Sequence, residues 1–250
     1  MSLPSNVEFV TEVKWPGNGF SLRATQYKID VPSGVPVTSI RMPNYVDVPG
    51  MSAALRSGST LAQGPGGQLG TVNGLVTSEL KLRFADVQKQ WSSRPLGGPN
   101  QGPVEFTFQG GKVHLDLSLG MYVLNTNKPA AGDAVSEKIF SVVYSHELLH
   151  VLDNIEMFNN WFMANLKMNR LIDDYLIKRK PYPYGRQSDQ PQMLIKEFPK
   201  FMTDKLETEA HNIWAVEANR RQALRDAPTE YKKVQDKIND LRSSRTMRRH

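Results

Sequence analysis

The amino-acid sequence predicts an α+β fold, with a small mixed sheet and hairpins in its first half and a mostly helical second half. Two observations lead to this prediction. Residues 7–48 and 104–124 contain alternating apolar and polar side chains, which is the period of half-buried strands. From residue 133 onward, apolar side chains instead recur at the spacing of an α-helix. At 250 residues, the chain is long enough to bury a sizeable core.

The first hundred residues are expected to form short strands and loops. Residues 7–48 are rich in Val, Thr, Phe and Ile, and two turns that contain Pro and Gly interrupt them. Residues 50–74 are rich in Gly, Ser, Gln and Pro, a composition that favours an exposed loop. We expect a helix over residues 78–91 and a turn-rich stretch over residues 92–103.

A β-hairpin is the clearest feature of the middle of the chain. Residues 104–108 and 113–117 each alternate with a period of two, and residues 109–112 between them have the composition of a turn. The second arm is expected to continue to Leu124. The sequence therefore predicts two strands that pair with each other.

Four helices are expected in the second half. Asp133 is a suitable N-cap for the first, in which apolar residues recur at helical spacing: Val135, Ile139, Val142, Val143, Leu149 and Leu152. The others are expected over residues 157–177, from residue 197 or 199 to 225, and over 228–242. An apolar stripe on the last helix indicates a packing face, formed by Tyr231, Val234, Ile238 and Leu241.

The first of these helices contains the sequence HELLH, an instance of the HExxH motif. His146 and His150 are four residues apart, so both imidazoles project from one helix face at a spacing suited to one tetrahedral zinc ion. Glu147 lies one step around the helix, where its carboxylate can act on a water molecule without itself holding the metal. The motif predicts Zn²⁺ as the cofactor and Glu147 as the catalytic base.

A catalytic zinc site needs a third protein ligand. The sequence around residues 206–217 resembles the gluzincins, in which a glutamate on a later helix completes the HExxH site. This resemblance assigns Glu207 as the third ligand. His211 shares its helical face and is the alternative, while Glu209 and Glu217 stay open. Glu156 has the spacing of the third ligand in metzincins, but the glycine that those proteins carry is here an aspartate.

The resemblance also implies an organisation for the chain. It implies a zincin-like fold and a catalytic core over residues 104–225, preceded by a β-rich, loop-rich region over 1–103. Residues 226–250 would add an amphipathic C-terminal helix and a basic tail. The strand at 113–117 would edge the sheet, as in zincins, and pair with an extended protein or peptide substrate.

The amino-acid composition limits the ligands and partners that we expect for this chain. The chain has no cysteine, so any metal site must use histidine and carboxylate ligands. Its net charge of +6 is concentrated late in the sequence, but no aromatic residues or nucleic-acid motif accompany the basic runs, so no specific nucleic-acid partner is expected.

No apolar run is long enough to span a membrane. The N-terminal residues do not have the pattern of a secretory signal, which leaves a cytoplasmic protein or one exported by a specialised route.

The motif, together with the resemblance, predicts a zinc-dependent endopeptidase. Three alternatives stay open at this stage. The zinc site could hydrolyse a bond other than a peptide, it could belong to a delivered toxin or effector, or it could only brace two helices of a structural protein. The oligomeric state does not follow from the sequence.

Overall fold

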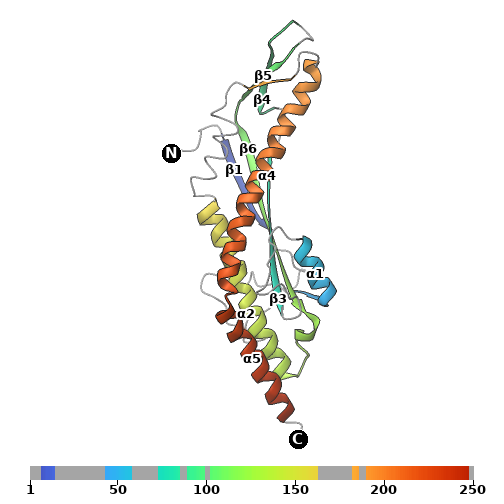
Figure 1. The fold of residues 1–250 in the computed structure, drawn as a ribbon, viewed down its shortest axis with the longest axis vertical. Helices are drawn as coiled ribbons and strands as arrows, with labels where there is room; N and C mark the ends of the chain where they lie inside the picture. The colour runs from blue at the N-terminus through green and yellow to red at the C-terminus, as the bar shows by residue number, and fades with distance from the viewer. Residues whose placement is uncertain are drawn as a thin grey trace. The chain divides into compact units, whose positions relative to one another are not determined.

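The computed structural model shows a mixed α+β chain, which confirms the predicted fold class (Figure 1). It describes residues 7–14, 43–57, 73–84, 89–98, 102–162, 182–185 and 190–247. The chain divides into two compact units, each built from segments that are distant in sequence. Unit 1 comprises residues 1–12, 80–117 and 158–214, and unit 2 comprises residues 13–79, 118–157 and 215–250. The boundaries at residues 103 and 225 stay predictions.

Unit 1 contains a three-stranded antiparallel sheet with an aromatic cluster. The strands, in spatial order, are β4 (Trp91–Pro95), β5 (Val104–Phe108) and β7 (Tyr182–Tyr184). Phe198 of helix α4 (Pro191–Arg225) stacks on Phe106 of β5, with ring centroids 4.3 Å apart. It also meets the ring of Trp91 edge-on at 5.3 Å. Burial of these rings holds the first half of α4 against this sheet.

A second sheet is built around the longest strand. Strand β6 (Gly111–Leu124) pairs with the other three, which are β1 (Val7–Lys14), β2 (Asn44–Val46) and β3 (Gly74–Phe84). Near its end β6 pairs in parallel with β2, where Tyr45 lies opposite Val123. Helix α1 (Val48–Ser57) covers this region through Met51, which is buried with Leu75 of β3.

Two long helices complete unit 2. Helix α2 (Ala134–Glu156) lies along helix α5 (Pro228–Met247), and the last turns of α4 lead into α5 (Figure 1). Ile238 of α5 is fully buried, as expected for the centre of a packing face. A short 3₁₀ turn, η3 (Asn125–Asn127), connects β6 to the loop before α2.

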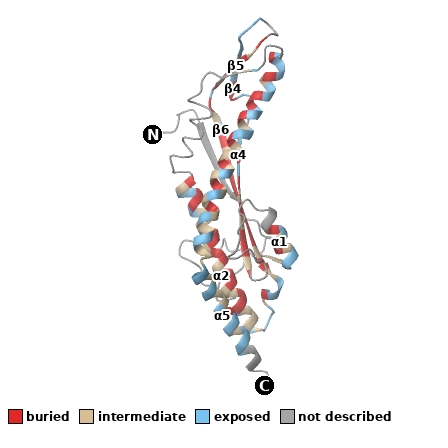
Figure 2. Cartoon of the chain, in the orientation of Figure 1, coloured by how far each residue is buried: buried red, intermediate tan, exposed pale blue. Residues whose placement is uncertain are grey.

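Helix α2 begins where the sequence predicts. The Asp133 side chain accepts hydrogen bonds from the backbone N–H groups of Val135 and Ser136 at 3.1 and 3.3 Å, which confirms its role as the N-cap. Buried residues then recur every three or four positions along the helix (Figure 2). They are Ile139, Phe140, Val143, Tyr144, Glu147, Leu148, His150 and Val151. Two polar side chains of the HExxH motif are therefore on the buried side.

The helix predicted over residues 78–91 is wrong, because this segment contains the second half of strand β3 and reaches the first residue of β4. From Val76 to Arg83 the buried side chains of β3 fall on even-numbered positions, Val76, Ser78, Leu80 and Leu82, while Lys81 and Arg83 are exposed. This period of two is present in the sequence. Strand β4 likewise occupies part of the stretch that was expected to form only turns.

The predicted hairpin is right in its strands but wrong in their pairing. Strand β5 pairs with β4 and β7, whereas β6 belongs to the other sheet and continues to Leu124 as expected. Gly110 and Gly111 both have positive φ angles, which let the chain leave one sheet and enter the other. Since β6 has three partner strands, it is not an edge strand, and the expectation that its 113–117 segment edges the sheet is wrong.

The remaining expectations have mixed outcomes. The last two predicted helices are confirmed as α4 and α5, and α4 begins several residues earlier than predicted. The loop expected from residue 50 is in part helix α1. Of the helix predicted over 157–177, Met157–Phe162 forms a π-helix, and the rest lies outside the described residues, as do residues 15–42 and 58–72. Among the described helices, none combines the length and apolarity that crossing a membrane requires.

Candidate metal centre

His146 and His150 converge on one point beside helix α2. Their Nε2 atoms are 3.3 Å apart, and the two rings are nearly perpendicular, with centroids 4.9 Å apart. His150 is only 3% exposed, while His146 is partly accessible. The four-residue spacing places both imidazoles on the same side of the helix, as predicted from the motif.

Asp226 is the third member of this group. It lies in the turn between α4 and α5, and its Oδ1 atom is 3.0 Å from Nε2 of His146 and 3.0 Å from Nε2 of His150. Within the described part of the chain, these three side chains form a group whose ligand atoms all lie within 4.8 Å of one another. Two nitrogen ligands and one carboxylate oxygen are a donor set that zinc uses in catalytic sites.

The spacing of the three atoms fits a tetrahedral ion. Ligand atoms about 2.0–2.1 Å from a tetrahedral zinc are about 3.3–3.4 Å apart, since the angle between them is near 109°. The two imidazole nitrogens of His146 and His150 have this separation, and the oxygen of Asp226 is only slightly closer to each. Three ligands of this kind leave a fourth position for water or substrate.

The contact between Asp226 and the two imidazoles shifts the pKa values of Asp226 and His146 in opposite directions. Burial would raise the pKa of Asp226, but hydrogen bonds from His146 and His150 outweigh it and hold the pKa well below its ordinary value. Burial would lower the pKa of His146, yet its hydrogen bond to Asp226 and the neighbouring charge of Glu147 raise it. Without a metal, these contacts favour a protonated imidazole beside an ionised carboxylate. Zinc would replace that proton, because it binds neutral imidazole.

The turn that carries Asp226 is fastened to α2 by its neighbour Arg225. This guanidinium donates two hydrogen bonds to the carboxylate of Asp153, at 2.9 and 2.6 Å. Asp153 is one turn beyond His150 on α2, so the ion pair joins the end of α4 to the helix that carries both imidazoles. Bidentate pairing of this kind fixes orientation as well as distance. Arg225 is therefore placed to position Asp226.

Glu147 is buried between α2 and the start of β3. It is only 4% exposed, and burial raises the pKa of its carboxyl group, against the opposing charges of His150 and His146. Gly74 makes room for it: a Cβ atom at residue 74 would lie 2.5 Å from Oε1 and 2.8 Å from Cδ of Glu147. Only glycine at this position lets the strand approach the carboxylate so closely.

A set of polar side chains surrounds the start of β3 and ties it to α5. Asn73 donates to Gln235 of α5 at 3.0 Å and accepts from Asn127 at 3.1 Å, and Arg242 of α5 donates to Asn127 at 3.1 Å. Tyr231 of α5 also hydrogen-bonds to Asn73, and its ring centroid is 6.4 Å from that of His146. These bonds hold α5 beside the motif helix.

The other candidate ligands predicted from the sequence lie outside this group in the described part of the chain. Glu207 and His211 lie in the part of α4 that belongs to unit 1, and burial raises the pKa of the Glu207 carboxyl group. Their role as the third ligand stays a prediction. Glu156 forms an ion pair with Arg221. Glu217 forms ion pairs with Arg220 and Arg221 of the same helix.

Asp226 was missed because it lies in a short inter-helix turn 76 residues beyond His150. In the sequence, an aspartate two residues before a helix is common at helix N-termini, so Asp226 does not stand out as a metal ligand. The packing of α5 on α2 is what brings it to the motif. No protein family, curated protein or solved structure was found to match this chain.

Replacing Gly74 should disturb Glu147. We expect Gly74→Ala to lower the free energy of unfolding by about 1–3 kcal/mol, the usual cost of an overpacked core. In a Glu147→Ala background, the same substitution should cost much less, because the carboxylate it meets is gone. Urea unfolding of the two single variants and the double variant measures this coupling. Strictly additive changes would show that Gly74 does not act through Glu147.

Arg225→Ala should loosen the turn that presents Asp226. We expect zinc affinity to fall about 10–100-fold, the range typical of residues that orient a ligand without touching the metal. Arg221→Ala is the matched control, since Arg221 also joins the end of α4 to an acid of α2 but does not adjoin Asp226. Competition with a chromophoric chelator gives both affinities. Equal losses in the two variants would contradict the positioning role.

Proposed function

We propose that this chain is a zinc-dependent peptidase in which His146, His150 and Asp226 hold the metal and Glu147 acts as the base. The observation that carries the proposal is the convergence of two Nε2 atoms and one carboxylate oxygen beside a buried glutamate of the same helix. The HExxH sequence supplies three of these four residues. The fourth comes from a segment that only the fold brings close.

When bound, zinc would lower the pKa of a water molecule from about 15.7 towards 7 and polarise the carbonyl of the bond to be cleaved. The protein residues have distinct tasks around it. His146, His150 and Asp226 fix the position of the ion and leave one side open. Arg225 and Asp153 fix the turn from which Asp226 comes.

Glu147 is suited to proton transfer. Its burial raises the pKa of the carboxyl group, which makes it a better base than an exposed glutamate, and its charge acts on both imidazoles. In the proposed reaction it takes a proton from the attacking water as oxygen bonds to the carbonyl carbon. When the C–N bond breaks, Glu147 gives that proton to the departing amine.

The proposed site keeps the HExxH zinc ligands of a zincin but differs from the gluzincins in its third ligand. The third ligand is an aspartate in the turn after α4, in place of a glutamate within that helix. Peptide remains the proposed substrate because of the HExxH sequence, which in the resembling enzymes serves amide hydrolysis.

A bracing role for zinc is the second candidate, and one observation favours it. Asp226 joins the α4–α5 turn to α2, so a metal there would strengthen the contact between these helices. A bracing site, however, needs only its ligands. It gives no reason for a carboxylate such as Glu147 to be buried at a desolvation cost beside the metal.

Zinc affinity distinguishes the candidate ligands. We expect Asp226→Ala to weaken zinc binding by more than about 100-fold, which exceeds the usual effect of residues that do not touch the metal. Glu207→Ala and His211→Ala should stay close to the wild-type affinity. Competitive titration of the three folded variants provides the comparison. If Glu207→Ala has the largest effect, the gluzincin assignment is right and Asp226 is not a ligand.

Glu147→Gln should separate catalysis from metal binding. The amide has nearly the same shape but cannot accept the proton, so we expect zinc content to be retained and peptide hydrolysis to fall about 10²–10⁴-fold. Hydrolysis is measured on a quenched fluorescent pool of random peptides, and zinc by elemental analysis of the same samples. Unchanged turnover in the variant would remove Glu147 from the mechanism.

A further inference from the structure

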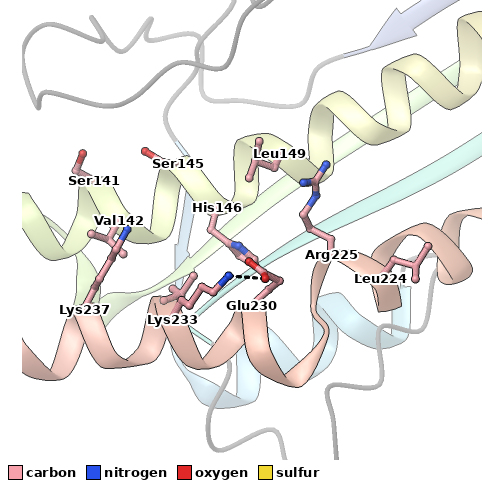
Figure 3. A pocket seen from close by; sticks show the side chains of 11 residues that line it. Ser141, Val142, Ser145, His146, Leu149, Leu224, Arg225, Glu230, Lys233 and Lys237 are labelled. Atoms are coloured by element: carbon pink, nitrogen blue, oxygen red, sulfur yellow. Dashed lines mark hydrogen bonds and ion pairs between the residues drawn. The ribbon is translucent and has the colours of Figure 1, made fainter.

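A pocket of about 560 Å³ lies beside His146, between one face of α2 and one face of α5. Figure 3 shows the His146 ring directed towards α5 along the wall of this pocket. All of the residues that line it belong to unit 2. Because His146 is a proposed zinc ligand, a group bound in the pocket would lie next to the reacting bond.

The pocket carries an excess of positive charge. Its acidic residue, Glu230, accepts a hydrogen bond from Lys233 at 2.6 Å, so these two charges compensate each other (Figure 3). Arg225 is already held by Asp153. Lys237 remains, and within the described part of the chain it forms no ion pair. The pocket therefore presents one uncompensated ammonium group.

The residues around Lys237 offer further contacts to a ligand. The pocket walls include the apolar side chains of Val142 and Val234, which can pack against the methylene groups of an acidic side chain, while the Lys237 side chain is exposed to solvent. Ser145 of α2 also lines the pocket, and its hydroxyl group can donate to a carboxylate. Val142 is four residues before His146, or about 6 Å along the helix axis.

We propose that this pocket binds an acidic side chain of the substrate, with Lys237 as its charge partner. The proposal rests on the proposed peptidase function and specifies its substrate class: peptides with Asp or Glu within about three residues of the cleaved bond. In an extended peptide, successive residues advance about 3.3 Å, so two residues advance about 6.6 Å, which is close to the rise of about 6 Å along α2 between Val142 and His146.

Nucleic acid is the main competing ligand for a cationic pocket. Single-stranded nucleic acids are usually bound by basic grooves that also contain aromatic side chains for base stacking. Among the described residues, those that line this pocket include no Phe, Tyr or Trp. The apolar walls and the adjacent His146 instead suit a peptide with an acidic side chain.

Binding tests the proposal independently of cleavage. The protein used is zinc-loaded Glu147→Gln, and the probes are two rhodamine-labelled decapeptides of alanine and glycine with either two central glutamates or two central glutamines. We expect the glutamate peptide to bind about five- to tenfold more tightly in fluorescence anisotropy, as for one partly screened charge pair. Adding Lys237→Glu should abolish this preference.

The matched control is Lys232→Glu, which makes the same change of charge on α5. Lys232 pairs with Asp236 and does not line the pocket, so it should retain the preference for the glutamate peptide. Equal affinities for the two peptides would overturn the proposal, and so would equal effects of the two lysine variants. Tighter, Lys237-dependent binding of a 20-nucleotide single-stranded DNA would assign the pocket to nucleic acid instead.

The same set of proteins separates this inference from the proposed function. A Lys237-dependent preference in binding, combined with no cleavage of either peptide by the wild-type zinc protein, would support the pocket and refute the peptidase. Cleavage of both peptides with equal kcat/KM and no difference in binding would support the peptidase and refute the pocket.

Discussion

The contact between two imidazoles of α2 and the carboxylate of Asp226 organises unit 2. It requires α5 to lie along α2, because the turn that carries Asp226 leads directly into α5. A charged carboxylate that is largely withdrawn from solvent is costly unless it is paired and hydrogen-bonded, and here two imidazoles satisfy it. The ion pair between Arg225 and Asp153 then fixes the same turn from its other side.

The start of strand β3 lies against Glu147 of α2 and is bonded to α5. Gly74 begins β3 without a side chain, which leaves space for the Glu147 carboxylate, and the next residue towards the N-terminus, Asn73, is bonded to α5 through Gln235. A glycine in a strand has an entropic cost and contributes no packing. Glycine at this position therefore costs local stability but leaves space for the buried Glu147 carboxylate.

The sequence predicts the parts of this arrangement that depend on local patterns. The N-cap Asp133, the periodicity of α2 and the spacing of His146 and His150 are all local, and so are the last two helices. Asp226 depends on how α5 packs on α2, which no local pattern contains. Strand β3 was mistaken for a helix although its alternation is visible, because Leu80, Phe84, Val87 and Trp91 recur at the spacing of a helix face. The partner of β5 depends on which sheet each strand joins after Gly110 and Gly111, and alternation alone cannot distinguish the two.

The most direct test of the metal centre is a crystal structure of the zinc-loaded protein, with the ion located by its anomalous scattering. The account predicts one zinc ion about 2.0–2.2 Å from Nε2 of His146, Nε2 of His150 and a carboxylate oxygen of Asp226, with a water molecule in the fourth position. A zinc ion bound by Glu207 in place of Asp226, or no anomalous peak at the two histidines, would contradict it.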